Sequence, residues 1–197
     1  MAKEFASPSA PLHDLWDLRP GVTYLNHGSF GPSPRPVRDA RRAWQAEIES
    51  EPMDFFSRRA EGLVHDVRAR LARFVGCDTE NLVLVDNATV AMNVVVANTR
   101  LAPGDQVLLT DHEYGAVSRM WGRACAEAGA ELVTAPLPFP LSTVEDVLSA
   151  LFARVTKRTR LIVVSHITSP TAVILPVAEI CREIIKKAAV FFAKEPR

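Results

Sequence analysis

From residue 81 onward, short runs of leucine and β-branched residues alternate with longer stretches that have helical spacing. The short runs occupy 81–85, 105–110, 130–135 and 159–167. The helical stretches cover 87–101, 114–129, 142–155 and 176–187. This alternation is typical of an α/β fold with a largely parallel sheet. A last apolar run, 188–193, predicts one more strand.

The first 76 residues do not follow this alternation. Residues 1–22 are rich in proline, serine and charge, so we expect an arm that is disordered or lies over another surface. Ser33 is predicted to cap a helix with Pro36 in its first turn, where a missing N–H is harmless. A second helix over 57–76 is expected to stop at Gly76.

In the part of the chain with alternating strands and helices, Ser142 and Glu145 predict a capping box at the start of the third helical stretch.

Composition restricts the class of protein. With 197 residues, 48% of them hydrophobic, the chain can bury a core of its own. Lys plus Arg and Asp plus Glu both number 23, so no global attraction to nucleic acid or an anionic membrane is expected. Cys77, Cys125 and Cys181 lie far apart, which argues against a zinc ribbon or a disulfide framework. Without a signal-peptide core or a membrane-length apolar run, we expect a cytoplasmic protein.

Polar residues follow the first of the apolar runs directly. In open α/β sheets, ligands bind beyond the carboxyl ends of the strands, so these positions are candidate sites. Asn87, Ala88 and Thr89 lie where a helix begins. Free backbone N–H groups and the Thr89 hydroxyl could hold a phosphate there. Equally, Asn87 or Thr89 could simply cap the helix.

Two further runs end in polar residues. His112, Glu113 and Tyr114 follow the second run, and the Tyr114 ring could stack on a planar ligand. In the fourth run, "LIVVS" (161–165) is followed by a segment that contains His166, Thr168 and Ser169. A single tyrosine is more often packing, and a single histidine is more often structural. Three polar segments, each after a predicted strand at the same sheet edge, together favour a binding site for a flat phosphorylated cofactor. A Rossmann-type nucleotide site would need a GxGxxG motif, which the sequence lacks.

Several motifs in order resemble a known family. They are "YLNHGSFGPSP" (24–34), "FF" with Arg58 downstream, "NAT.AMN" (87–93), "L.PGDQVLLTDHEYGA" (101–116) and "VVSHITSPTAVILPV" (163–177). Over about residues 20–182 the chain resembles the isopenicillin N epimerase-like branch of the class V aminotransferase superfamily, whose members use pyridoxal 5′-phosphate. The resemblance implies the three-layer α/β/α large domain of fold type I, a mostly parallel sheet, and a homodimer acting on an amino acid.

The resemblance also implies roles for individual residues. Ala88 and Thr89 would bind the cofactor phosphate, and Tyr114 would stack on the pyridine ring. Ser169, with Thr168, would hydrogen-bond the 3-hydroxyl of the ring. On the substrate side the family places the loop that holds Asn26, His27 and Gly28. Arg58 would bind a carboxylate, although it could also belong to a solvated helix face.

The chain departs from the family at two catalytic positions. Such enzymes need a lysine that forms a Schiff base with the cofactor and an aspartate that keeps the pyridine nitrogen protonated. Aligned without a gap, Lys194 falls at the aspartate position and Arg197 at a nearby histidine. None of the lysines has the expected context: Lys3, Lys157, Lys186, Lys187 and Lys194.

These departures lead to an expectation about the chain as a whole. We expect the N-terminal half of such an enzyme, with an altered tail after about residue 183 and without the small C-terminal domain. Its parts would be the arm (1–22), a segment of loop and helices (23–76) and a partial cofactor-binding large domain (77–197). By itself this chain would have no catalytic residue and no activity. The alternative is a non-enzymatic relic that binds cofactor weakly or pairs with another chain.

Overall fold

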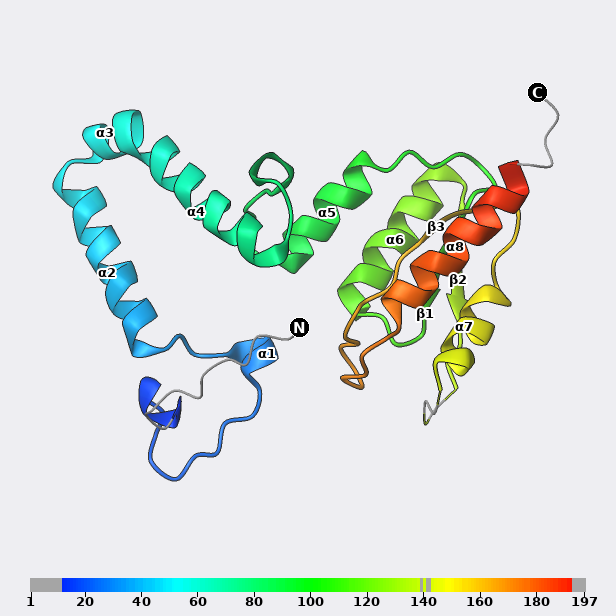
Figure 1. Cartoon of the computed structure of the whole chain (residues 1–197), viewed down its shortest axis with the longest axis horizontal. Helices are drawn as coiled ribbons and strands as arrows, with labels where there is room; N and C mark the ends of the chain where they lie inside the picture. Colours follow the sequence, from blue (N-terminus) through cyan, green and yellow to red (C-terminus); the bar gives the residue numbers. More distant parts are fainter. Residues whose placement is uncertain (1–11, 139, 141–142, 193–197) are drawn as a thin grey trace. The chain divides into compact units, whose positions relative to one another are not determined.

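The chain divides into two compact units, Met1–Leu84 and Val85–Arg197, in a computed structural model (Figure 1). The structure describes residues 12–138, 140 and 143–192. The division falls directly after Leu84, inside the apolar run at 81–85. Each unit is therefore considered by itself below.

The first unit is helical. Its elements are η1 (Leu12–Leu15), α1 (His27–Phe30), α2 (Arg35–Ser50), α3 (Pro52–Asp54), a π-helical turn η2 (Phe55–Arg59), α4 (Ala60–Val75) and η3 (Thr79–Asn81). Gly76 ends α4 at φ 78°, a left-handed conformation that glycine adopts without strain, as the sequence predicts. The prediction of a Ser33 cap is wrong. Pro34, in extended conformation, precedes α2, and no side chain caps it.

The second unit has an α/β layered order. Its elements are α5 (Ala88–Asn98), β1 (Gln106–Thr110), α6 (Gly115–Ala128), β2 (Glu131–Ala135), α7 (Val144–Phe152), β3 (Thr159–Ile162) and α8 (Val177–Phe192). The sheet has the order β2-β1-β3, and both pairings are parallel. These strands and helices confirm the predicted alternation, although β3 is shorter than the 159–167 run.

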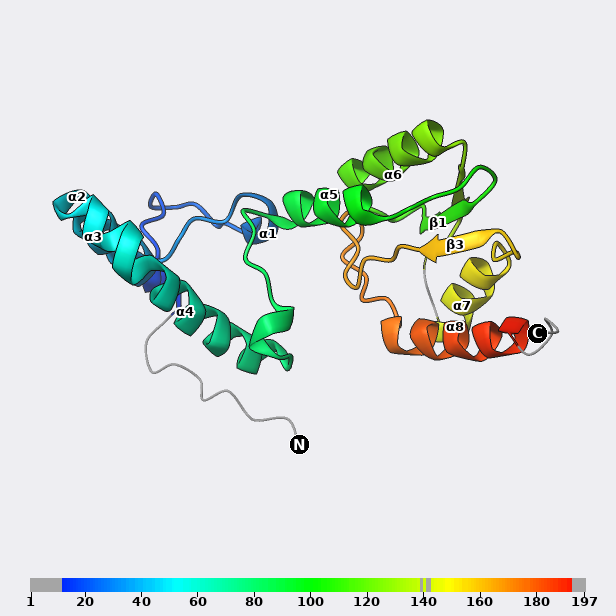
Figure 2. The ribbon, with the colours of Figure 1, turned by 90° about the horizontal axis from the view of Figure 1, so that it is seen from above.

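The central strand β1 divides the core between two faces of the sheet. Side chains alternate along a strand, so Val107 and Leu109 lie on one face and Leu108 on the other. Val107 and Leu109 pack with Trp121 of α6, and residues of α5 join this cluster. Leu108 packs with Leu151 of α7 and with residues of α8. Figure 2 shows the resulting three layers, with α5 and α6 on one face and α7 and α8 on the other.

Two predicted strands are absent from the described residues. Residues 82–85 are not in a strand, and Val83 is 76% exposed. A strand requires a partner for its backbone groups, and none lies beside this run among the residues that the structure describes. The run 188–193 was also predicted to be a strand. Instead α8 continues to Phe192, because no glycine or proline lies between Val177 and Phe192 to end it and two alanines favour helix. Ala193 lies outside the described residues.

The capping box of α7 lies one residue later than predicted. Thr143 Oγ1 accepts a hydrogen bond from the Asp146 N–H at 3.1 Å, and Asp146 Oδ2 accepts one from the Thr143 N–H at 2.9 Å. Thr143 and Asp146 repeat the pattern of Ser142 and Glu145, a hydroxyl residue followed three positions later by an acidic one. Ser142 lies outside the described residues. The shift moves the start of α7 to Val144.

Removing this cap tests its position. Thr143→Ala should lower the free energy of unfolding by about 1 kcal/mol, because the Asp146 N–H loses its acceptor. Chemical denaturation measures the change. Ser149→Ala, an exposed position of the same helix, is the control and should change stability by less than about 0.5 kcal/mol. Equal effects of the two substitutions would contradict the assignment.

Candidate functional site

The ends of β1 and β3 lie at one edge of the sheet, which we call the carboxyl edge. The two strands are parallel, and pairing extends one residue beyond β3, where the Val163 N–H donates to the Leu108 carbonyl at 2.9 Å. Figure 2 shows the arrowheads of both strands at the same end of the unit, together with the beginnings of α5 and α6 and the segment before α8. The predicted convergence of polar segments therefore occurs, although the segment before α5 is not a strand.

Glu113 connects the segments that follow β1 and β3. This residue is only 8% exposed. Oε1 accepts hydrogen bonds from the Ser165 hydroxyl at 2.6 Å and from the Tyr114 backbone N–H at 2.8 Å. Oε2 accepts one from the Ser165 backbone N–H at 3.1 Å. Three donors thus compensate the cost of burying this carboxyl group.

Tyr114 stands at the carboxyl edge immediately before α6. It is the N-cap residue of that helix, with extended backbone geometry, and its side chain makes no capping hydrogen bond. About half of the residue, 49%, is exposed. An aromatic ring in this position is accessible to a planar ligand.

A tight turn over 167–174 follows β3 and presents Ser169. Ile167 and Ile174 form an antiparallel bridge, and Thr168 exchanges two backbone hydrogen bonds across the turn. Thr168 is 2% exposed, and its hydroxyl accepts from the Val173 N–H at 2.9 Å. Ser169, in contrast, is exposed. The structure thus separates the two predicted hydroxyl residues: Thr168 faces into the turn, and Ser169 lies on its outside.

The same turn is tied to the segment after β1. His112, 8% exposed, has Nδ1 at 2.9 Å from the Thr171 hydroxyl. That hydroxyl lies 2.7 Å from the Thr168 hydroxyl. His166, at the base of the turn, is exposed, and its backbone carbonyl accepts from the Leu175 N–H. His112 therefore has a structural contact that ties this turn to the segment after β1.

The beginning of α5 offers free hydrogen-bond donors. Asn87 caps the helix, because its Oδ1 accepts from the Val90 N–H at 2.9 Å. Among the described residues, the N–H groups of Ala88 and Thr89 have no hydrogen-bond partner. We call these two N–H groups the phosphate seat. The capping interpretation of Asn87 is confirmed, and it is compatible with anion binding because the cap uses a different N–H.

The remaining predicted residues belong to the unit Met1–Leu84. Asn26 precedes α1, which contains His27 and Gly28, and all three are exposed. The His27 ring lies edge-on to Trp16 and to Tyr24, with ring centroids 5.5 and 5.1 Å away.

Arg58 forms an ion pair with Asp54 at 2.9 Å, four residues earlier. Its side chain is 76% exposed. This geometry matches the solvated helix face that the sequence left open, and an exposed pair of this kind contributes little stability.

The arm is attached to the first unit near α2. Trp16 donates from Nε1 to the Pro32 carbonyl at 2.8 Å. Asp17 pairs with Arg38 and Arg35, and these two guanidinium groups lower the pKa of the Asp17 carboxyl below its ordinary value. The arm residues Asp14, Trp16 and Asp17 thus contact the loop before α2 and the first turn of α2 itself.

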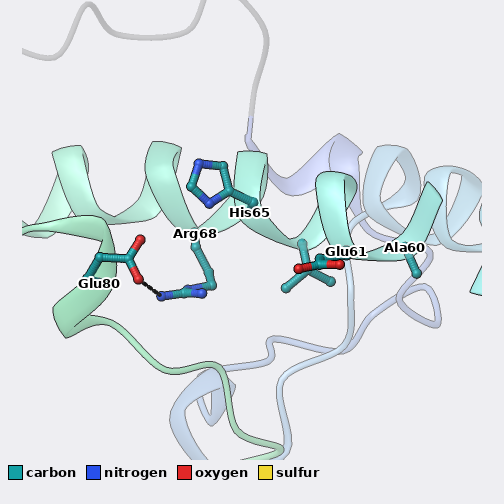
Figure 3. A pocket seen from close by; sticks show the side chains of 6 residues that line it. Ala60, Glu61, His65, Arg68 and Glu80 are labelled. Atoms are coloured by element: carbon teal, nitrogen blue, oxygen red, sulfur yellow. Dashed lines mark ion pairs between the residues drawn. The ribbon is translucent and has the colours of Figure 1, made fainter. Parts of the chain in front are cut away.

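Sequence reasoning did not single out a hollow on α4. It has a volume of about 490 Å³ and is lined by Ala60, Glu61, Val64, His65, Arg68 and Glu80 (Figure 3). Arg68 is already engaged, because it donates to the carbonyls of Leu82 and Thr79 at 3.0 and 2.8 Å. Its guanidinium also lies 3.7 Å from Glu80. The main role of Arg68 is therefore to hold the segment after α4.

Sequence reasoning also missed Ser165 and Thr171. Ser165 stands at the end of the fourth apolar run, so a search for every polar residue at a strand end would have found it. Thr171 has no such signal, since its contact with His112 joins residues 59 positions apart. Within the described part of the chain, no helix is long and apolar enough to cross a membrane.

Known structures share this architecture. A structure of the protein C-DES with glycine covalently linked to its PLP cofactor matches with a TM-score of 0.80 and 25% identity, over 88% of this chain and 45% of that one. A complex of the cystine C-S lyase C-DES with its product cysteine persulfide matches with a TM-score of 0.75 and 25% identity, over 81% of this chain and 42% of that one. The three-layer fold is therefore that of pyridoxal-phosphate-dependent enzymes of fold type I.

The family follows from the sequence match. The model of the family "Aminotransferase class-V" matches residues 32–193, so the chain belongs to that family. Isopenicillin N epimerase of Streptomyces clavuligerus is 39% identical over 166 residues, which are 84% of this chain and 42% of that protein. L-cysteine desulfhydrase of Arabidopsis thaliana is 31% identical over 181 residues, which are 83% of this chain and 40% of that protein. The chain spans less than half the length of these relatives, and the resemblance seen in the motifs is confirmed.

Proposed function

We propose that this chain supplies the cofactor-holding part of a pyridoxal-phosphate-dependent class-V enzyme that acts on an amino acid. The observation that carries the proposal is the presence of three different ligand groups at the carboxyl edge. They are the free N–H groups of the phosphate seat, the half-exposed Tyr114 ring and the exposed Ser169 side chain. A phosphate, a flat ring and a ring hydroxyl are the three features of pyridoxal phosphate that such groups recognise.

The residues present fit the cofactor at its phosphate and ring. The phosphate seat stands at the N-terminus of an 11-residue helix, where the helix dipole also favours an anion. Tyr114 would cover one face of the ring, and Ser169 would hydrogen-bond the 3-hydroxyl, with Thr168 holding the turn from inside. When bound, the cofactor supplies an electron sink for bond breaking at the amino-acid α-carbon. The residues of this chain bind and orient the cofactor.

We propose that this chain alone does not turn over amino acids. Lys157 precedes β3, at the opposite edge of the sheet, and Lys186 pairs with Glu183 at 2.6 Å on α8. Lys3 and Lys194 lie outside the described residues. A lysine and an acid for the chemical step would come from a part of the protein that this sequence does not contain. Coverage of less than half of each relative supports this proposal.

The reaction and setting of the complete protein are further parts of the proposal. The relatives are named as isopenicillin N epimerases and L-cysteine desulfhydrases, and the epimerases have the higher identity, 38–39% against 27–36%. An epimerisation of an amino acid is therefore the reaction to assay first. We propose Asn26, His27, Gly28 and Arg58 for the substrate side, and a cytoplasmic homodimer for the complete protein.

The phosphate seat can be tested by a proline. Ala88→Pro removes one N–H at the first residue of α5, where proline fits a helix, and the preceding Asn87 already has the extended conformation that proline requires. We expect affinity for pyridoxal phosphate and for inorganic phosphate to fall by about tenfold, because a charge-assisted hydrogen bond is lost. Isothermal titration calorimetry on the full chain measures both.

A matched control separates this effect from helix disruption. Val144→Pro places proline at the first residue of α7 after an equally extended cap, away from the site, and should leave both affinities unchanged. Failure of the unmutated chain to bind pyridoxal phosphate would overturn the proposal and favour a non-enzymatic relic. Turnover of amino acids by the chain alone would overturn the proposed lack of activity.

A further inference from the structure

The buried Glu113 carboxylate holds together the two segments that carry Tyr114 and Ser169. It accepts the Tyr114 backbone N–H on one side, at the point where α6 begins. On the other side it accepts both the hydroxyl and the backbone N–H of Ser165. The two segments come from different strands, and the hydrogen bonds join residues 52 positions apart. The carboxylate is therefore a direct link across the carboxyl edge.

The link continues rigidly from Ser165 to Ser169. The His166 carbonyl accepts from the Leu175 N–H at 2.8 Å, which closes the base of the turn. Thr168 then exchanges backbone hydrogen bonds across the turn and is almost fully buried. Since Ser165 stands directly before this closed turn, a shift of Ser165 would move Ser169 with it. A second contact, between His112 and Thr171, also joins this turn to the segment after β1.

A structural brace alone would not require a charged group in this position. Burying a carboxylate is costly, and apolar residues of similar size usually stabilise a core as well or better. Two oxygen atoms that accept from three donors do, however, define the distance and angle between two backbone segments. Such definition is what a site needs when two groups must contact one rigid ligand.

We propose that Glu113 is a positioning residue that sets the spacing between the Tyr114 ring and the Ser169 hydroxyl, and thereby selects a flat hydroxylated ring. This inference rests on the proposed function. Glu113 itself does not touch the ligand. Its effect passes through the backbone of Tyr114 on one side and of Ser165 on the other. The phosphate seat on α5 makes no hydrogen bond with Glu113, so phosphate binding does not depend on it.

Glu113→Gln tests the inference with a nearly isosteric change. The amide oxygen can still accept two of the three hydrogen bonds, but the amide nitrogen would meet the Ser165 N–H, donor against donor. We expect the affinity for pyridoxal phosphate to fall by about tenfold, whereas the affinity for inorganic phosphate stays unchanged. The ratio of the two affinities is the readout, because a general loss of folding would lower both.

Two further variants make the test specific. Glu131→Gln changes a glutamate at the opposite edge of the same sheet, where its Oε2 accepts from Gln106, and should alter neither affinity. Ser165→Ala should weaken pyridoxal phosphate binding in the same selective way, and the double variant Glu113→Gln/Ser165→Ala should be no weaker than either single one. Non-additivity of this kind is the signature of two residues acting through one link.

The outcomes separate this inference from the proposed function. Binding of pyridoxal phosphate by the unmutated chain, with selective loss in Glu113→Gln, supports both. Equal affinity of Glu113→Gln and the unmutated chain overturns the positioning role alone. Parallel loss of pyridoxal phosphate and inorganic phosphate shows a merely structural role and also overturns it. If the unmutated chain binds no pyridoxal phosphate, the proposed function fails and the inference fails with it.

Discussion

Replacing Trp121 by alanine should lower the free energy of unfolding of the second unit by about 3–5 kcal/mol, the range for removal of a large buried aromatic side chain. Trp121 is fully buried in α6 and packs with Val107 and Leu109 of the central strand. Truncation would leave a cavity between the helix layer and the sheet. Urea denaturation followed by far-ultraviolet circular dichroism measures the loss.

Trp121→Phe is the matched control for this prediction. The indole N–H of Trp121 is buried without a hydrogen-bond partner among the described residues, so its removal relieves an unsatisfied donor. Phenylalanine would also keep most of the aromatic packing. We therefore expect a loss clearly smaller than that of alanine. A phenylalanine variant as unstable as the alanine variant would show that the ring alone does not account for the stabilisation.

Replacing Leu151 by alanine should have the second large effect, about 2–5 kcal/mol of unfolding free energy. Leu151 is fully buried on α7 and packs against Leu108 on the other face of the sheet. The same denaturation measurement applies. Leu148→Ala on the same helix is the control, and it should cost less because Leu148 is only partly buried and less apolar area leaves water.

The two core variants together test whether the layers unfold as one unit. Trp121 and Leu151 lie in separate clusters on opposite faces, and these clusters share the central strand β1. A strand that contributes alternate side chains to both faces couples them, so each variant should show a single transition at lower urea. Two separate transitions in the spectroscopic signal of this unit would contradict that coupling.

Much of the layered unit could be predicted from hydrophobic pattern. The runs around Leu108, Leu132 and Leu161 are short, apolar and bounded by turn residues, and all three form parallel strands. Asn87 and Gly129 mark helix ends, because an amide side chain and a left-handed glycine satisfy helix termini locally. The positions of Tyr114 and Ser169 at the carboxyl edge follow from the parallel order of the strands.

In each wrong prediction, the local composition fits more than one structure, and the surrounding structure decides between them. The run with Val83 at its centre has the composition of a strand, yet strand formation depends on a neighbouring backbone that local sequence does not supply. The run after Lys187 is equally apolar, but it continues a helix that nothing interrupts. For α7, two adjacent pairs of hydroxyl and acidic residues satisfy the capping pattern, and local composition does not distinguish them.

The sequence by itself determined the type of fold, the family and the residues that line the carboxyl edge, since these depend on pattern and on motifs of adjacent residues. Only the tertiary structure decided which of those residues touch. The hydrogen bonds of Glu113 with Ser165 and the contact of His112 with Thr171 join positions 52 and 59 residues apart. Such contacts depend on the register of β1 against β3, which the packing of two helix layers on the sheet sets and no local pattern encodes.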